Sequence, residues 1–306
     1  MAAPLLSRKT AIKIKVESTK GTEISGDTDI LVSDIEMNPE SDYTRRNGAG
    51  LYLGNNVAGV VDGRIGKCTF TMELMAYTGH ALNPGLAILL QACGMAQATQ
   101  VYTIHSTFTN QVCISIDYFQ DGLEKTLFGA MGNVTFEGEA GKRILCKFEF
   151  TGLYKAIADT ALPSFAPATQ KPMLMQSGAF TMNSAAKNIS RFSLNLGNVV
   201  SMRADPSKAG GLISAIITDY DPELSVDPEA DNVATYAFEA LWQAGTEHAI
   251  SLAVSDGIDK ATFTLPKVQA KSLPHTDRDG ILVHDWKGQC NHSSGNDAVS
   301  MAVATV

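Results

Sequence analysis

The acidic residues of this chain gather in one stretch, where their carboxylates could bind a cation. They are Asp219, Asp221, Glu223, Asp227, Glu229 and Asp231. A calcium-binding EF-hand loop needs a central glycine and a terminal bidentate glutamate at fixed positions, and neither falls in register here. We therefore interpret the stretch as a solvated, charge-rich loop.

Other patterns that could support catalysis or phosphate binding are incomplete. Gly63 to Cys68 (GRIGKC) lacks the four-residue spacer and the Ser or Thr of a phosphate-binding loop. The six histidines have no partner at metal-ligand spacing, and His284 and Asp285 would point to opposite faces of a strand. No Gly-x-Ser-x-Gly elbow is present. We expect no enzyme, no cofactor and no metal site.

Composition and net charge limit the kinds of molecule that this protein could bind. The chain has 306 residues, a net charge of -8 and a pI of about 5.2. Tight binding of nucleic acid requires clustered Lys and Arg, so a nucleic-acid-binding surface is not expected. The acidic charge is compatible with a surface along which DNA passes without binding. There is no apolar run of about 18 residues to cross a membrane. The N-terminus lacks signal-peptide order, which indicates cytoplasmic synthesis.

The five cysteines favour buried free thiols in a reducing compartment. They are odd in number, widely spaced, and form no Cys-x-x-Cys pair. The two tryptophans, Trp242 and Trp286, are expected in the core.

One helix followed by β-strands is predicted in the middle of the chain. Asn83-Pro84 is a good helix start and Gly94 a good stop. The strands that follow are predicted at Val112 to Phe119, Lys125 to Phe128, Asn133 to Glu139 and Ile144 to Thr151.

The same order of elements recurs near the C-terminus. A second helix is predicted from Phe238 to Gly245. Strands then follow at Ala249 to Val254, Ala261 to Leu265, Lys267 to Leu273 and Ile281 to Gly288. Earlier strands are predicted at 11–17, 28–37, 59–75, 189–200 and 213–219. We infer an internal duplication.

This duplication predicts two domains. The first spans 1–160 and includes a free N-terminal arm and a long polar loop at 38–57. A proline-rich linker at 161–175 precedes the second domain, 176–306, with a shorter polar loop at 203–211.

Short motifs spread over nearly the whole chain resemble the major tail tube proteins of long, flexible-tailed bacteriophages. They include the Arg45-Arg46-Asn47 to Tyr52-Leu53-Gly54-Asn55 segment, Phe70-Thr71-Met72-Glu73-Leu74, Leu89-Leu90-Gln91-Ala92-Cys93-Gly94, Phe136-Glu137-Gly138-Glu139, Phe150-Thr151-Gly152-Leu153-Tyr154 and Leu194-Asn195-Leu196-Gly197-Asn198. One departure is at Glu17 to Thr22, where the family often has an aromatic residue before Gly-Thr.

The resemblance implies a structural virion protein with a mainly β (α+β) fold. Expected are two tandem tail-tube-type β-sandwich domains, each with one flanking helix. Their inner sheets would join into a closed barrel around a lumen through which the genome is ejected. The tape measure, terminator and distal tail proteins are expected partners, with assembly in the host cytoplasm.

The resemblance also suggests an assembly and its contacts. Since family rings use about six tube domains, we favour a trimeric, pseudo-hexameric ring over a hexamer. Contacts between stacked rings are expected from the polar loop, through Glu40, Asp42, Tyr43, Arg45, Arg46 and Tyr52. The candidate lumen-facing acids are Asp117, Glu124, Glu137, Glu139 and Asp259.

Two other classes remain open from the sequence alone. The chain could be another virion component, such as a sheath, terminator or capsid-decoration protein. A glycan-binding β module is a further alternative, although its usual aromatic-lined groove has few candidates in a chain with two tryptophans.

Overall fold

The computed structural model describes residues 4–50, 54, 56–77, 79–176, 178–208 and 210–306. In its first half, strands and one α-helix follow each other in the chain order below. They are β1 (Thr10–Val16), β2 (Thr28–Asp29), β3 (Ser33–Asn47), β4 (Asn56–Glu73), β5 (Ala76–Tyr77), β6 (Ala81–Leu82), α1 (Pro84–Ala92), β7 (Met95–Ala98), β8 (Val101–Ile104), the short 3-10 helix η1 (Phe108–Asn110), β9 (Ile114–Gln120), β10 (Leu123–Glu139), β11 (Leu145–Tyr154) and β12 (Ala158–Asp159).

The second half is again mostly strands, with one short helix. Its elements are β13 (Phe180–Met182), β14 (Ala185–Ala186), β15 (Arg191–Asn195), β16 (Asn198–Ala204), β17 (Leu212–Tyr220), β18 (Glu223–Val226), α2 (Phe238–Gln243), β19 (Glu247–Ser255), β20 (Asp259–Ser272), β21 (His275–Arg278), β22 (Ile281–His284), β23 (Trp286–Asn291) and β24 (Ser300–Thr305). The mainly β prediction is therefore confirmed.

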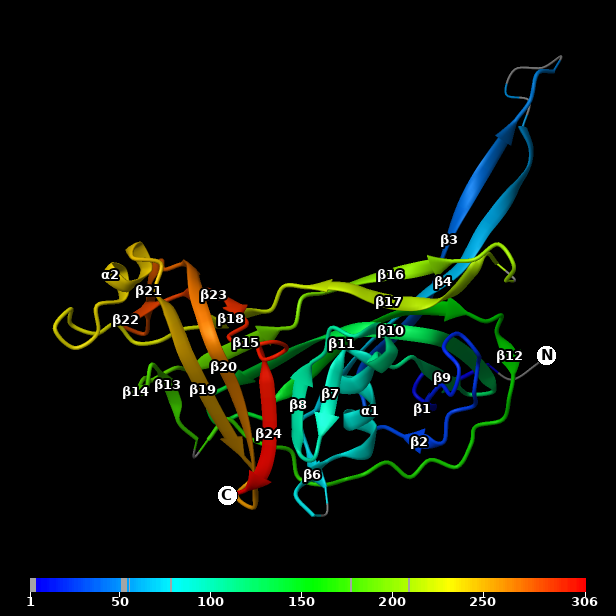
Figure 1. Ribbon diagram of the computed structural model, residues 1–306. Helices are drawn as coiled ribbons and strands as arrows, with labels where there is room; N and C mark the ends of the chain where they lie inside the picture. Colours follow the sequence, from blue (N-terminus) through cyan, green and yellow to red (C-terminus); the bar gives the residue numbers. More distant parts are fainter. Residues whose placement is uncertain (1–3, 51–53, 55, 78, 177, 209) are drawn as a thin grey trace.

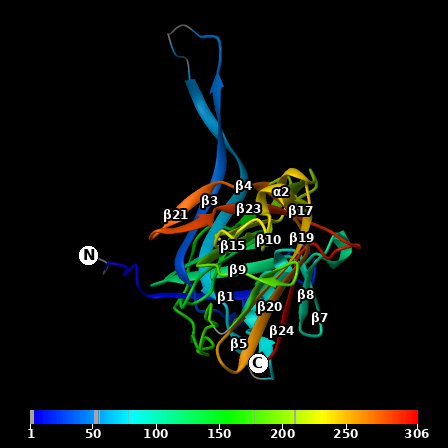
Figure 2. The ribbon, with the colours of Figure 1, turned by 90° about the vertical axis from the view of Figure 1, so that its left-hand side faces the viewer.

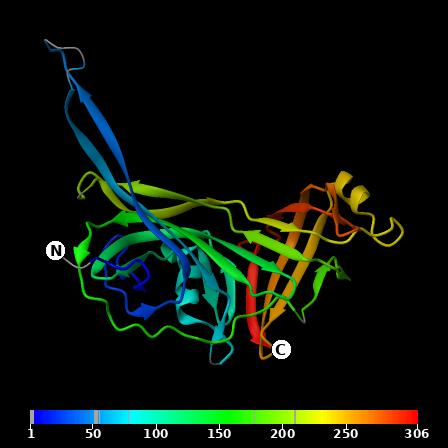
Figure 3. The ribbon, with the colours of Figure 1, turned by 180° about the vertical axis from the view of Figure 1, so that it is seen from behind.

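The two halves pair their strands in the same antiparallel order. In the first half the order is β1-β9-β10-β11-β4-β3, and in the second it is β13-β19-β20-β23-β18-β15. The C-terminal part of β10, beyond the end of β9, pairs with β15 and joins the halves into one sheet (Figure 1; Figure 3 from behind). Within the described strands these pairings branch but never return to their start, so the sheet of one chain is open.

Several strand predictions were wrong in their boundaries: the strands predicted at 261–265 and 267–273 are the single strand β20, and 28–37 and 281–288 are each divided between two strands. β10 is one strand where two were predicted; Gly129, at φ +57°, lies in an irregularity that bends the strand without ending it. Conversely, 189–200 is not one strand, because Gly197 adopts φ +64° and turns the chain between β15 and β16. A glycine thus bends one strand and ends another, and only the surrounding pairing distinguishes the two cases.

The predicted polar loop at 38–57 is wrong: most of it is a β-hairpin formed by β3 and β4. Pairing continues to Asn47↔Asn56, so only 48–55 lie between the strands. The hairpin projects far from the rest of the molecule (Figure 2). Strand formation follows from Val57, Val60 and Val61, whose β-branched side chains favour extended backbone and outweigh the polar residues opposite them.

A second hairpin, β16–β17, comes from the second half and lies across the first half (Figure 1). Its turn, 205–211, coincides with the shorter predicted loop at 203–211. Ala215 and Ile217 pack on Cys113 and Met131, and the Gln111 side chain donates to the Ile217 carbonyl (3.0 Å). This contact makes the hairpin part of the first half's surface.

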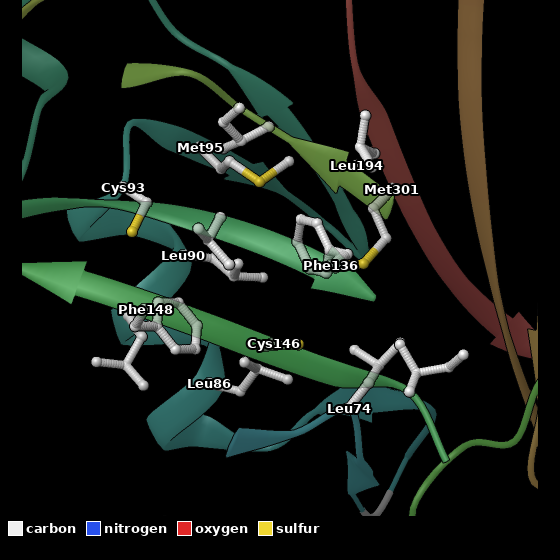
Figure 4. Packing of buried hydrophobic residues seen from close by; sticks show 14 of the residues in the cluster. Leu74, Leu86, Leu90, Cys93, Met95, Phe136, Cys146, Phe148, Leu194 and Met301 are labelled. Carbon is white, nitrogen blue, oxygen red and sulfur yellow. The ribbon is translucent and has the colours of Figure 1, made fainter. Parts of the chain in front are cut away.

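One hydrophobic core extends through both halves. Phe136 of β10 pairs with Leu194 of β15, and both lie near Met301, in the same cluster as the α1 residues Leu86 and Leu90 (Figure 4). The Phe136 and Phe263 rings meet edge to face with centroids 5.1 Å apart. The core therefore crosses the junction between β10 and β15.

The helix ends match the sequence prediction. The Asn83 side chain accepts hydrogen bonds from the Gly85 and Leu86 amides, and Gly94 takes φ +80° after the last turn of α1. The second helix ends before Gly245, at φ +65°. No helix in the described ranges is long and apolar enough to span a membrane.

The segments outside the strands also contact the body. Residues 4–9 were expected to be free, but the Leu6 amide donates to Asp121 (2.6 Å). No strand covers 160–171, and the next residues run along the first half, where the Met173 amide donates to the Leu74 carbonyl (2.8 Å). The division at 161–175 stays a prediction.

Candidate functional site on the polar face of the sheet

One face of the shared sheet carries a continuous row of polar side chains. Direct cross-strand partners extend it over seven strands, in the order Thr71, Lys147, Thr135, Asn195, Glu223, Gln289 and Gln269. The neighbouring row, which includes Phe136 and Leu194, points into the core. Strand alternation thus produces one polar face, defined here by this row and its neighbours Glu137, Glu139, Arg191, Ser193, Ser225 and Lys287.

Charges on this polar face occur mostly as opposite pairs. Lys147 contacts Glu137 (2.7 Å), and Lys271 contacts Glu223 (3.1 Å). At the rim, Lys142 contacts Glu139. These exposed pairs add little to stability. Their effect is to keep the local charge near balance, so the face is not the purely acidic surface suggested by the net charge.

The five predicted lumen acids do not lie together. Glu137 and Glu139 belong to the polar face, at the junction between β10 and β15. Asp117 and Asp259 are buried, with 3% and 7% of their surfaces exposed. Glu124 lies at the start of β10, where it accepts a hydrogen bond from Thr160 (2.7 Å). Their facing the lumen stays a prediction.

Buried carboxylates in the first half serve the local fold. Asp117 accepts from the Gly26 amide (2.8 Å), and Glu17 accepts from the Gly21 and Gly129 amides and from Ser115. Burial raises the pKa of both carboxyl groups, against these hydrogen bonds, which lower it. They hold residues 17–27 over the sheet.

Asp227 forms a charged cluster that the sequence alone did not reveal. The stretch containing it was interpreted as solvated, but Asp227 is buried, directly after β18. It accepts from the amides of Ser190 (2.8 Å) and Arg191 (2.9 Å), from the Ser190 hydroxyl, and from Arg278 (2.9 Å). Burial raises its pKa, but the hydrogen bonds prevail and leave the pKa below its usual value. No local pattern marks Arg278 as its partner.

We expect Asp227→Asn to lower the free energy of unfolding by about 2 kcal/mol at pH 7, the scale of hydrogen bonds to a charged group. Because the folded pKa is lowered, this stabilisation is present above the unfolded pKa of about 3.9 and is lost as the pH falls through the folded value. Urea unfolding at pH 7 and pH 3 measures it, with the exposed Asp219→Asn as control. An equal difference at both pH values would contradict the ionised pairing.

The predicted stacking residues lie on the β3–β4 hairpin as far as the structure describes them. Tyr43, Arg45 and Arg46 are exposed near its end, and Arg45 donates to Asn56 (2.6 Å). Glu40 contacts Lys67 nearer the base (3.1 Å). Asp42 is placed by its backbone pairing with Asp62, and Tyr52 lies outside the described residues. Their role in stacking is untested.

The candidate metal-binding groups, the hollow on the polar face, the thiols and the tryptophans are placed as follows. Within the described ranges, no group of three His, Cys, Asp or Glu side chains is arranged to hold a metal ion. A shallow hollow lies over the β10–β15 junction, lined by residues of both charges, including Glu137, Arg143, Arg191 and Lys287. The five cysteines are buried free thiols, as predicted. Trp286 is also buried, but the prediction for Trp242 was wrong, since 43% of its surface is exposed.

Comparison with known families gives one match over almost the whole chain. A family model described as phage tail tube protein matches residues 7–294. No curated protein matches the chain.

Proposed function

Because the chain belongs to the family of phage tail tube proteins, we propose that it assembles into rings that stack into a bacteriophage tail tube, through which the genome is ejected. The protein is then a structural component of the virion tail, and we expect no catalytic activity. The resemblance of its motifs favours a long, flexible tail assembled in the host cytoplasm. The tape measure, terminator and distal tail proteins would be its partners.

We further propose that each chain supplies two tube units, one from each half. The same order of pairing in both halves supports this. We align the halves by matching the cross-strand partners Val134, Phe148 and Phe70 of the first half with Ala270, Gly288 and Leu224 of the second, and the other positions follow by counting along each strand. The shared strand order is the observation on which the proposal depends most.

The β10–β15 junction within one chain suggests how two chains would join. Within the chain, Thr135 of β10 pairs with Asn195 of β15. By the same count, Thr135 corresponds to Lys271 of β20, and Asn195 corresponds to Glu36 of β3. Both residues are exposed, and the β20 edge beyond Gln269 and the outer edge of β3 have no strand partner within the described residues.

Two copies can therefore join by pairing the end of β20 with β3 of the next copy. Lys271 would then lie opposite Glu36, an attractive cross-strand pair. This pairing removes two open sheet edges that would otherwise promote uncontrolled association. Every junction then resembles the β10–β15 junction. Because rings of the resembled family use about six tube domains, three chains would close the ring, and we favour this trimer over a hexamer.

In such a ring the polar face would line the lumen. Glu137 and Glu139 lie on it, whereas the burial of Asp117 and Asp259 argues against their direct contact with DNA. Lys147 and Arg191 on this face contact the acids Glu137 and Asp285, which weakens their attraction for phosphate and would let DNA slide. The stacking role of the β3–β4 hairpin remains a prediction.

Negative-stain electron microscopy and mass measurement of the purified protein test this function. At high protein concentration we expect hollow tubes built from rings of three chains with pseudo-sixfold symmetry. Rings of six equivalent chains would contradict the trimer but keep the tube function. A monodisperse monomer at every concentration would contradict both.

A further inference from the structure

We propose that the β3–β4 hairpin docks on the second half of the adjacent chain in the same ring, with Val61 against Ala249. The proposal rests on the ring proposed above and adds a specific contact surface to it. It places Tyr43, Arg45 and Arg46 between neighbours in one ring, in place of the contact between stacked rings predicted from the sequence. A contact of the same kind exists within one chain, where the β16–β17 hairpin lies on the first half.

The internal contact is closely fitted. Ala215 is fully buried, and the Cys113 sulfur lies 3.9 Å from its carbonyl oxygen. Gln111 bonds both the carbonyl and the amide of Ile217 (3.0 and 3.3 Å). A side chain in place of Gly21 would collide with the Ile213 carbonyl, since its Cβ would lie at 1.9 Å. The first half is therefore shaped to receive this hairpin.

The two hairpins have matching registers. In β3–β4, three residues forward from Glu40 and four residues back from its partner Ile65 lead to the directly opposed pair Tyr43↔Val61. In β16–β17, the same count from the pair Val199↔Asp219 leads to the directly opposed pair Met202↔Ala215. Both hairpins also shift register on either side of this pair. Val61 thus occupies the place of Ala215, and Tyr43 that of Met202.

This face of the β3–β4 hairpin is uncovered in the single chain. Tyr43 is 65% exposed and Val61 66% exposed, whereas their counterparts Met202 and Ala215 contact the first half. The Tyr43 ring lies over Gly59, where a Cβ would meet it at 2.3 Å, so Tyr43 and Gly59 share a face. An apolar face on a projecting hairpin indicates a contact with another molecule.

The surface that corresponds to the receiving site is also uncovered. Cys113 and Ala249 occupy matching positions, each six residues before a strand pair that we align between the halves. In the first half this pair is Phe119↔Glu124. In the second half it is Ser255↔Lys260. Cys113 is buried under the hairpin, but Ala249 is exposed between the buried His248 and Ile250.

Groups near Ala249 can contact the arginines at the end of the β3–β4 hairpin. In the internal contact the Arg203 guanidinium lies 5.0 Å from the Phe108 ring, in the segment before β9. The segment before β19 contains the exposed Trp242, and Glu247 opens that strand. Arg45 and Arg46 at the hairpin end can contact this aromatic ring and carboxylate. Glu247 already contacts Lys267 (3.4 Å), so the exposed Trp242 ring is the main acceptor for these arginines, and the register of the hairpin is what fits it to a second copy of the chain.

Cysteine cross-linking tests the contact. Rings of a Val61→Cys/Ala249→Cys variant are treated with a short bis-maleimide and resolved on a denaturing gel. The native thiols make a quiet background: burial raises the pKa of Cys68, Cys113 and Cys290 to about 12 and also raises those of Cys93 and Cys146. Val60→Cys/Ala249→Cys is the matched control, because successive strand residues point to opposite faces.

We expect linked dimers and trimers, and nothing larger, from the first variant, at least fivefold more than from the control. Products of more than three chains from three-chain rings would instead assign the hairpin to the adjacent ring and overturn the proposal. Equal or absent cross-linking in intact rings would also overturn it. If the first variant forms no rings, Tyr43→Cys/Lys267→Cys, which corresponds to Met202 and Met131, takes its place. Ring formation, seen by microscopy before cross-linking, separates failure of the tube function from failure of this contact.

Discussion

Reversing one charge, in the variant Lys271→Glu, is expected to weaken ring formation, and the further change Glu36→Lys is expected to restore it. In the proposed junction these side chains lie opposite each other on paired strands, where like charges repel. Each ring repeats the mismatch at every junction between chains. We expect the protein concentration needed for half-maximal assembly to rise at least tenfold in either single variant, which corresponds to about 0.9 kcal/mol for each of the three junctions of the ring.

Size-exclusion chromatography over a concentration series, with microscopy of the same samples, measures this effect. Lys287→Glu is the matched control, since Lys287 is also exposed on the polar face but belongs to β23, which is paired on both sides. Thermal unfolding of the monomer shows whether Lys271→Glu acts locally, through Asp221 and Glu223. If the double variant assembles no better than the single variants, the proposed register between β20 and β3 is wrong.

Mixing the two single variants distinguishes a three-chain ring from a six-chain ring. A junction between one Lys271→Glu chain and one Glu36→Lys chain is always attractive, because either two reversed charges or two unchanged charges meet there. A junction between two copies of the same variant is repulsive. Alternating the variants makes every junction attractive only if the number of chains is even. A trimer always keeps one mismatched junction, so we expect the mixture to assemble less well than the double variant. Full recovery on mixing would support the hexamer.

Phe136→Ala is expected to be the most destabilising single substitution in the core, by about 3 to 5 kcal/mol. Phe136 is fully buried on β10, pairs with Leu194 of the second half, and contacts the Phe263 ring at 5.1 Å. Its removal leaves a cavity where both halves meet, and the paired strands around it cannot collapse easily. The loss should therefore reach both halves together.

Urea unfolding followed by circular dichroism measures the stability of this variant. Phe165→Ala is the control, because Phe165 is 37% exposed, and we expect a change within about 0.5 kcal/mol. Fluorescence of the buried Trp286 reports on the second half. A loss below about 1 kcal/mol, or an unchanged second-half transition, would show that the core is not shared across the junction.

Local patterns were enough to predict α1, the strand-rich class and the repeated order of elements. Helix capping by Asn83 and the stop at Gly94 depend on neighbours in the chain, and period-two alternation needs only a few consecutive residues. The buried state of the five thiols also followed from residue type. The resemblance of short motifs indicated the tail tube family, which the match over residues 7–294 confirmed.

Pairing between distant segments determined the features that local patterns did not predict. Charge and polarity made 38–57 look like a loop, but the pairing of β3 with β4 satisfies its backbone and turns it into a hairpin. Asp227 is buried because Arg278, far along the chain, supplies the opposite charge. Asp117 and Glu137 both carry carboxylates on alternating strands, yet one lies under residues 17–27 and the other on an open face. Which side chains a sheet leaves exposed depends on what crosses over it, and that is set by contacts between distant segments.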